Sequence, residues 1–164
     1  MAQVTLRGNP IATSGELPAV GSKAPDFALI TSGMETVSLG DLAGSRVVLN
    51  ISPSVDTAVC ATAVRSFNER AIDLEDTKVL TVTADLPFAH ARFCGAEGIE
   101  NVTGTSTFRS DFPDVYGVRM VEGPLADLCA RAVVVIDRDG TVIHSQLVPS
   151  VGEEPDYDAA LAVL

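Results

Sequence analysis

The stretch that decides the fold is Val47-Val48-Leu49-Asn50-Ile51-Ser52-Pro53-Ser54-Val55-Asp56-Thr57-Ala58-Val59-Cys60. Its first five residues form an almost continuous apolar run between the polar pair Ser45-Arg46 and Pro53. Such a run is typical of a strand that is covered on both faces. We therefore expect a strand in the interior of a sheet, followed by a short turn at Pro53.

Helical periodicity follows this turn. From Thr57 onward, apolar residues recur every three or four positions, with charged residues between them. These apolar residues are Val64, Phe67, Ala71 and Leu74. The spacing predicts an amphipathic helix that ends near Asp76 and places Cys60 close to its start.

The remaining patterns extend this strand–helix unit in both directions. Val4 and Leu6 alternate around Thr5 before the turn residues Gly8-Asn9-Pro10, which predicts an N-terminal β-hairpin. We expect strands over residues 27–30, 79–83, 102–108, 132–136 and 141–147, and helices over 87–94 and 155–164. This order predicts an α/β, thioredoxin-like fold: a central mixed sheet flanked by helices, with the N-terminal β-hairpin outside it. Because no repeat or linker interrupts the pattern, residues 1–164 are expected to form one domain.

Composition excludes several classes of function. The chain has 164 residues, 46% of them hydrophobic, which is typical of a globular protein. Its formal net charge is −11, with 22 acidic against 11 basic residues, and this charge repels phosphate backbones. We therefore expect no nucleic acid partner. Because no apolar run resembles a signal sequence or a membrane span, we also expect a cytoplasmic protein that does not bind membranes.

The cysteines and histidines give no metal or haem pattern. Cys60, Cys94 and Cys129 are the only cysteines, too few for a disulfide framework. No Cys-x-x-Cys or His-x-x-x-His spacing occurs, and His90 and His144 each stand alone. We expect no cofactor, so the chemistry must come from side chains.

Cys60 is the candidate reactive group. The N-terminus of a helix lowers a cysteine pKa from about 8.5 toward roughly 3.5 to 7.5, so Cys60 is expected to be a thiolate. Thr57, one turn earlier, is placed to bond either the sulfur or a substrate oxygen, and Pro53 can shield the sulfur. The alternative is that Cys60 extends the apolar helix face, since it precedes Val64 by four residues.

Phosphatase chemistry also uses a thiolate near a helix N-terminus. Phosphatase loops of that type place an arginine six positions after the cysteine, within a glycine-rich cradle. Here Arg65 stands five positions after Cys60, and no such cradle surrounds it. The spacing therefore disfavours a phosphatase.

Pro53-x-x-x-Thr57-x-x-Cys60 resembles the active-site signature of the peroxiredoxins. Four longer blocks resemble the bacterial thiol peroxidase subfamily, an atypical two-cysteine group. The blocks cover residues 50–57, 84–89, 92–98 and 130–137, and the similarity extends from Gly8 to Tyr157. The resemblance thus spans nearly the whole chain.

This resemblance implies an enzyme, a thioredoxin-dependent peroxidase. It makes Cys60 the peroxidatic cysteine, Cys94 the resolving cysteine of the same chain, and Arg131 the guanidinium beside the thiolate. Thr57 and Pro53 complete the pocket. Peroxide oxidises Cys60 to a sulfenic acid, and Cys94 converts this acid to an intrachain disulfide. Hydrogen peroxide and organic hydroperoxides are the implied substrates, thioredoxin the implied reductant, and a homodimer the implied assembly.

Two residues fall outside the pattern of the family. Cys129 has no place in the catalytic pattern and is expected to be a small apolar filler near the strand that carries Arg131. Ser52 stands where the subfamily commonly has an aromatic residue, which affects the packing behind the pocket.

A peroxide-sensing redox switch using the same disulfide is the alternative function. A general thiol-disulfide oxidoreductase is disfavoured by the missing Cys-x-x-Cys.

The two catalytic cysteines are expected to stand apart before reaction. Cys60 begins one predicted helix and Cys94 ends another, with a strand between them. A disulfide requires Cα atoms within about 7 Å, and we expect a larger separation in the reduced protein. The short helix over residues 87–94 is the element expected to unwind when the disulfide forms.

Overall fold

A computed structural model describes residues 1 to 164, and most of its strands belong to one sheet. They are β3 (Ala28–Thr31), β4 (Thr36–Ser38), β5 (Arg46–Ile51), β6 (Thr77–Thr83), β7 (Thr103–Ser106), β8 (Ala132–Ile136) and β9 (Val142–Leu147). The order across the seven-stranded sheet is β4-β3-β7-β6-β5-β8-β9. β5, β6 and β7 are parallel, whereas β8 pairs with β5 in the antiparallel sense. The predicted mixed sheet is confirmed, with β5 in its interior.

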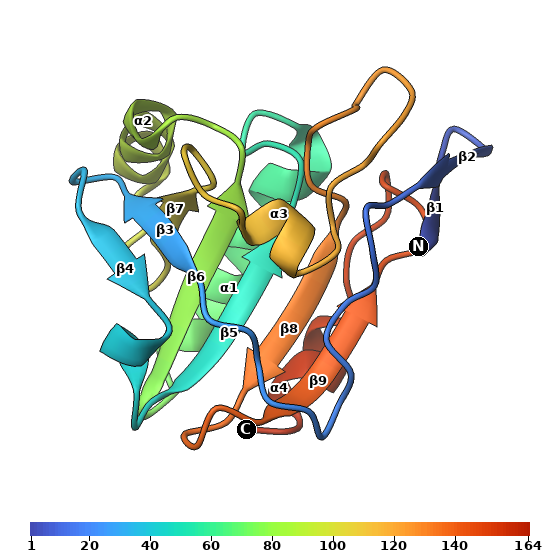
Figure 1. Cartoon of the computed structure of the whole chain (residues 1–164). Helices are drawn as coiled ribbons and strands as arrows, with labels where there is room; N and C mark the ends of the chain where they lie inside the picture. The colour runs from blue at the N-terminus through green and yellow to red at the C-terminus, as the bar shows by residue number, and fades with distance from the viewer.

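Helices cover both faces of this sheet. They are α1 (Ala58–Ala71), α2 (Pro87–Glu97), α3 (Phe112–Val115), α4 (Tyr157–Leu161) and the short 3-10 helix η1 (Gly40–Leu42). In Figure 1, α1 and α4 lie behind the sheet and α3 lies in front of it. Val47 and Leu49 of β5 pack on the α3 side, whereas Val48 packs with the residues of α1, α2 and α4. Both faces of β5 are therefore buried, which explains its unbroken apolar sequence.

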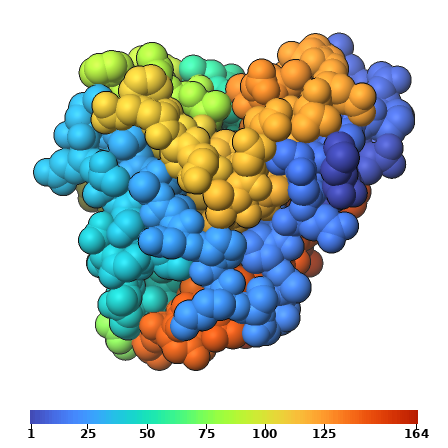
Figure 2. All heavy atoms as spheres, viewed as in Figure 1, coloured from blue at the N-terminus to red at the C-terminus, as the bar shows by residue number.

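The N-terminal hairpin forms a separate sheet from β1 (Gln3–Leu6) and β2 (Asn9–Ala12). Its turn lies at Arg7-Gly8, where both residues have positive φ (51° and 81°). The prediction that Asn9 and Pro10 belong to the turn is therefore wrong, because they already pair as part of β2. Figure 2 shows the chain after the hairpin crossing the face of the molecule beside residues from the 100–130 region.

Several predicted helix boundaries need correction. α1 ends at Ala71, because a turn follows it and β6 begins at Thr77, directly after Asp76 at φ 49°. α2 continues to Glu97, so Gly95 lies inside the helix rather than at its end. The residue that ends it is Gly98, in the left-handed conformation (φ 65°) that favours glycine. α2 is thus about a turn longer than predicted.

Short elements were missed where the sequence has no clear period. β4 and α3 have no counterpart among the predicted elements, and the predicted C-terminal helix is confined to Tyr157–Leu161. Asp156 begins that helix by accepting a hydrogen bond from the Ala159 amide. None of the helices combines the length and the apolar character needed to cross a membrane.

Candidate active site

Cys60 lies in the first turn of α1, as its position in the sequence predicts. Thr57 is the N-cap of the helix, and its hydroxyl oxygen accepts a hydrogen bond from the Cys60 amide at 3.3 Å. The same hydroxyl donates to the Ser54 carbonyl at 3.2 Å. Thr57 therefore hydrogen-bonds to the amide of Cys60 and not to its sulfur. Cys60 is fully buried, and Pro53, just before the turn, is buried too.

Arg131 lies beside the sulfur of Cys60 because of strand register. Ala132 pairs with Ile51, so the residue before β8 reaches the loop that leaves β5. Nη2 of Arg131 donates to Sγ of Cys60 at 3.2 Å. Nε and Nη2 donate to the carbonyl of Val151 at 3.1 and 2.9 Å, and Nη1 has no partner in the chain. The guanidinium is thus held in place with one free donor group.

The charge of Arg131 is buried without a carboxylate. Only 1% of the residue is exposed, and none of the ion pairs includes it. A buried cation is costly unless an anion accompanies it. The side-chain group that the guanidinium does contact is the sulfur of Cys60, 3.2 Å from Nη2.

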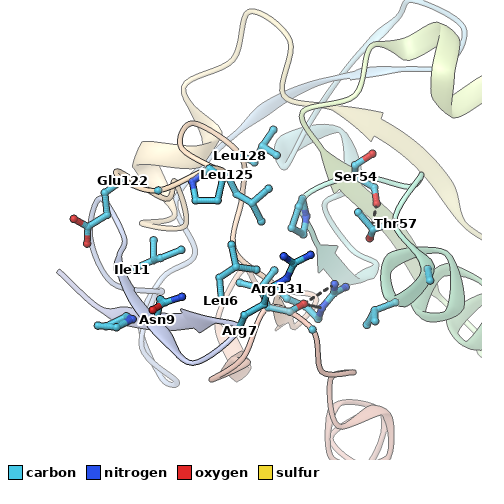
Figure 3. A pocket seen from close by; sticks show the side chains of 18 residues that line it. Leu6, Arg7, Asn9, Ile11, Ser54, Thr57, Glu122, Leu125, Leu128 and Arg131 are labelled. Atoms are coloured by element: carbon cyan, nitrogen blue, oxygen red, sulfur yellow. Dashed lines mark hydrogen bonds between the residues drawn. The ribbon is translucent and has the colours of Figure 1, made fainter.

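A cavity of about 820 Å³ opens next to this pair. Pro53, Thr57 and Arg131 lie on its walls, and Cys60 lies behind them. Leu6, Ile11, Leu125 and Leu128 supply apolar lining, and Arg7, Asn9 and Glu122 add polar groups. In Figure 3 the hairpin residues Leu6 and Ile11 face Ser54 and Thr57 across this space, with Arg131 between them. Of Pro53, Thr57 and Arg131, it is Arg131 that also contacts the sulfur directly, so it connects the cavity with Cys60.

Cys94 lies in α2 and is half-buried against the core cluster shared with α1. Burial raises the pKa of its thiol, so the thiol is protonated in this state. All three cysteines are free, and nothing bonds Cys94 to Cys60. The structure therefore describes the dithiol form, with the two predicted catalytic cysteines on different helices.

Cys129 is completely buried in the core cluster on the α3 side of the sheet, which confirms it as an apolar filler. Burial raises its pKa to about 12, so it is an inert thiol.

We predict that Cys129→Ser keeps the peroxidase rate and lowers the free energy of unfolding by about 1–3 kcal/mol. The reason is that the serine hydroxyl is buried in a site that is otherwise apolar. Steady-state assays and chemical denaturation measure both effects. A folded but inactive variant would show that Cys129 takes part in the chemistry.

Sequence reasoning missed several residues of the site. Val151 binds Arg131 through a backbone carbonyl, which carries no side-chain signal. Leu125 and Leu128 belong to a segment without periodicity, and only the fold brings them to the cavity. Ser52, the departure noted above, is fully buried and its hydroxyl has no partner.

The fold and this geometry define a class: a thioredoxin-like redox protein with one buried cysteine beside an arginine at a helix N-terminus. The family model described as Redoxin matches residues 19–161. The chain belongs to the Redoxin family and, within it, to the group of the thiol peroxidases.

Similar proteins from three bacteria support this placement. "Thiol peroxidase" of Mycobacterium tuberculosis is 57% identical over 164 residues, covering 100% of this chain and 99% of that protein. "Thiol peroxidase" of Corynebacterium glutamicum is 54% identical with the same coverage. The crystal structure of a peroxiredoxin-like protein from Aquifex aeolicus superposes with a TM-score of 0.94 at 40% identity, covering 99% of this chain and 96% of that one. Full-length agreement means that the whole fold, not one motif, is shared.

Proposed function

We propose that this chain reduces hydrogen peroxide and organic hydroperoxides with the thiolate of Cys60. The observation that carries the proposal is the 3.2 Å contact between Nη2 of Arg131 and Sγ of Cys60. The sulfur attacks one peroxide oxygen, the O–O bond breaks, and Cys60 becomes a sulfenic acid. The departing oxygen takes a proton and leaves as water or alcohol. Positive charge at Arg131 stabilises the negative charge that moves from sulfur to oxygen.

Thr57, Pro53 and Arg131 have separate roles in this step. The free Nη1 group of Arg131 can donate to a peroxide oxygen. Thr57 fixes the first turn of α1, and Pro53 limits access of water to the sulfur. Apolar walls of the cavity can accept the carbon chain of an organic hydroperoxide.

We propose that Cys94 then resolves the sulfenic acid. Its sulfur attacks the sulfur of Cys60, the S–S bond forms, and the hydroxyl group of the sulfenic acid leaves with the Cys94 proton as water. Burial raises the pKa of Cys94 in the folded helix, so exposure to water increases the thiolate fraction of this attacking thiol. This favours opening of α2 before the disulfide forms.

Cys94→Ser is predicted to react once with peroxide and then stop. The sulfenic acid on Cys60 has no resolving thiol in this variant, so thioredoxin-coupled turnover falls to a small fraction of the wild-type rate. Rapid-quench mass spectrometry measures the first oxidation, and NADPH consumption measures turnover. Undiminished steady-state turnover would mean that another thiol resolves Cys60.

Opening of α2 is predicted to depend on pH through His90. This residue is fully buried in α2, and desolvation lowers its pKa from 6.5, although Asp85 opposes the shift. In open α2 the ring returns to its ordinary pKa, so opening takes up a proton. As pH falls below 6.5, the equilibrium constant for opening of α2 therefore rises by up to about tenfold per pH unit. This rise stops once pH reaches the lower pKa that His90 has in the folded state.

Hydrogen exchange of the α2 amides at pH 5.5 and 7.5, corrected for intrinsic rates, measures this effect. His90→Gln is the matched control, because glutamine keeps a donor but does not titrate in this range. Equal protection of α2 at both pH values in the wild-type protein would contradict the prediction.

The resemblance further supports thioredoxin as the reductant, a homodimer and a cytoplasmic location, and we include these in the proposal. A coupled assay with thioredoxin, its reductase and NADPH tests the function as a whole. Many peroxides consumed per chain support the enzyme, whereas about one per chain indicates a redox switch. Comparing hydrogen peroxide with cumene hydroperoxide in the same assay tests the apolar cavity.

A further inference from the structure

Asp85 lies just after β6, between the loop that leads to Cys60 and helix α2. One carboxylate oxygen, Oδ1, accepts a hydrogen bond from the Ser54 hydroxyl at 2.8 Å. The other, Oδ2, accepts from the Val55 amide at 2.8 Å and from the Thr83 hydroxyl at 2.7 Å. Asp85 forms no ion pair. The carboxylate therefore accepts hydrogen bonds from three donors and pairs with no cation. Hydrogen bonds to an ionised acceptor are stronger than those between two neutral groups.

From Ser54 the hydrogen bonds continue to Cys60. The Ser54 carbonyl accepts from the amide of Thr57 at 3.3 Å and from its hydroxyl at 3.2 Å. The hydroxyl of Thr57 in turn accepts from the Cys60 amide. Movement of Ser54 thus displaces the N-cap, and with it the helical turn that holds the sulfur against Arg131.

From Asp85 the hydrogen bonds also continue through Thr83 to α2. The Thr83 hydroxyl and Nε2 of His90 lie 2.9 Å apart, both fully buried. Because Thr83 gives its only proton to Asp85, His90 must donate from Nε2, which leaves Nδ1 as an acceptor without a partner. A Cβ on Gly104 would stand 2.8 Å from this Nδ1, so the ring is tightly confined. His90 is one turn before Cys94, so the network joins both cysteine-bearing helices.

We propose that Asp85 is a positioning residue of the peroxide reaction. Its carboxylate holds the Ser54–Cys60 turn in its reactive geometry by accepting from Ser54 and Val55. This inference rests on the proposed function, because it requires Cys60 to be the residue that peroxide oxidises.

Asp85→Asn tests the proposal. The amide keeps the shape of the side chain but offers only one acceptor oxygen, so bonds on one side of the carboxylate are lost. We expect oxidation of Cys60 to slow at least about tenfold. The conversion of sulfenic acid to disulfide, followed in the same samples, should not slow, because that step depends on the opening of α2 and not on the reactive geometry of the Ser54–Cys60 turn. Rapid-quench mass spectrometry resolves both steps in a single turnover.

Two further variants separate positioning from general damage. Asp73→Asn changes an exposed aspartate near the end of α1 and should match the wild-type protein. Ser54→Ala removes one donor to Asp85 and should slow oxidation less than Asp85→Asn. If Asp85 acts through Ser54, the effect of Ser54→Ala shrinks in the Asp85→Asn background. Circular dichroism checks folding, and if Asp85→Asn does not fold, slower oxidation in Ser54→Ala supports the proposal and an unchanged rate overturns it.

Other outcomes overturn the positioning role while leaving the proposed function intact. These are oxidation of Cys60 in Asp85→Asn within about twofold of the wild-type rate, equal slowing of both steps, or strictly additive effects of the two substitutions. Failure of peroxide to oxidise Cys60 in the wild-type protein would instead refute the proposed function.

Discussion

Cys60→Ser is expected to abolish peroxide consumption. The serine hydroxyl has almost no ionised fraction at neutral pH, so it is a very poor nucleophile even beside Arg131. The rate of peroxide loss in the coupled assay should fall to that of the assay without protein. Hydrogen peroxide and cumene hydroperoxide should both lose all enzyme-dependent reduction, because the same sulfur attacks each of them.

Cys129→Ser is the matched control for this result, because it makes the same chemical change in a cysteine outside the site. Circular dichroism establishes that both variants are folded. Peroxide consumption at the wild-type rate by folded Cys60→Ser would refute the assignment of Cys60. Loss of activity in both folded variants would show that Cys129 also takes part in the chemistry.

Arg131→Ala should slow oxidation of Cys60 by about 10² or more, which corresponds to roughly 3 kcal/mol of transition-state stabilisation. The substitution removes both the donor to the sulfur and the free Nη1 group. It also leaves the Val151 carbonyl without its partners. The measurement is the second-order rate constant for oxidation of Cys60, obtained in a single turnover.

Arg131→Lys separates charge from geometry. Lysine keeps the positive charge but lacks the planar set of donors that reaches Val151 and Cys60 together. Its rate constant should lie between those of the wild-type protein and Arg131→Ala. An unchanged rate constant in folded Arg131→Ala would show that the guanidinium only packs against the sulfur.

The parts of the fold that local pattern determines were predictable from the sequence. β5 has an apolar run covered on both faces, and α1 has helical periodicity, so both elements were found. Their boundaries were less accurate, because the end of a helix depends on single residues. The helix predicted over residues 87–94 continues past Gly95, because Gly98 is the residue whose left-handed conformation ends it.

The candidate site was predictable only in part. Local spacing placed Cys60 and Thr57 at the start of a helix, but Arg131 and Cys94 were assigned through the family resemblance. The contact between Arg131 and Cys60 depends on the pairing of β8 with β5, which no local pattern encodes. Asp85 shows the same limit, since its three donors come from the separate segments 54–55 and 83.

The most direct test of the central claim is disulfide mapping after one equivalent of peroxide. The reduced protein is oxidised, alkylated without reduction, digested and analysed by mass spectrometry. We predict an intrachain disulfide between Cys60 and Cys94, with Cys129 recovered as an alkylated thiol. A disulfide that includes Cys129, or Cys60 recovered unoxidised, would contradict the mechanism.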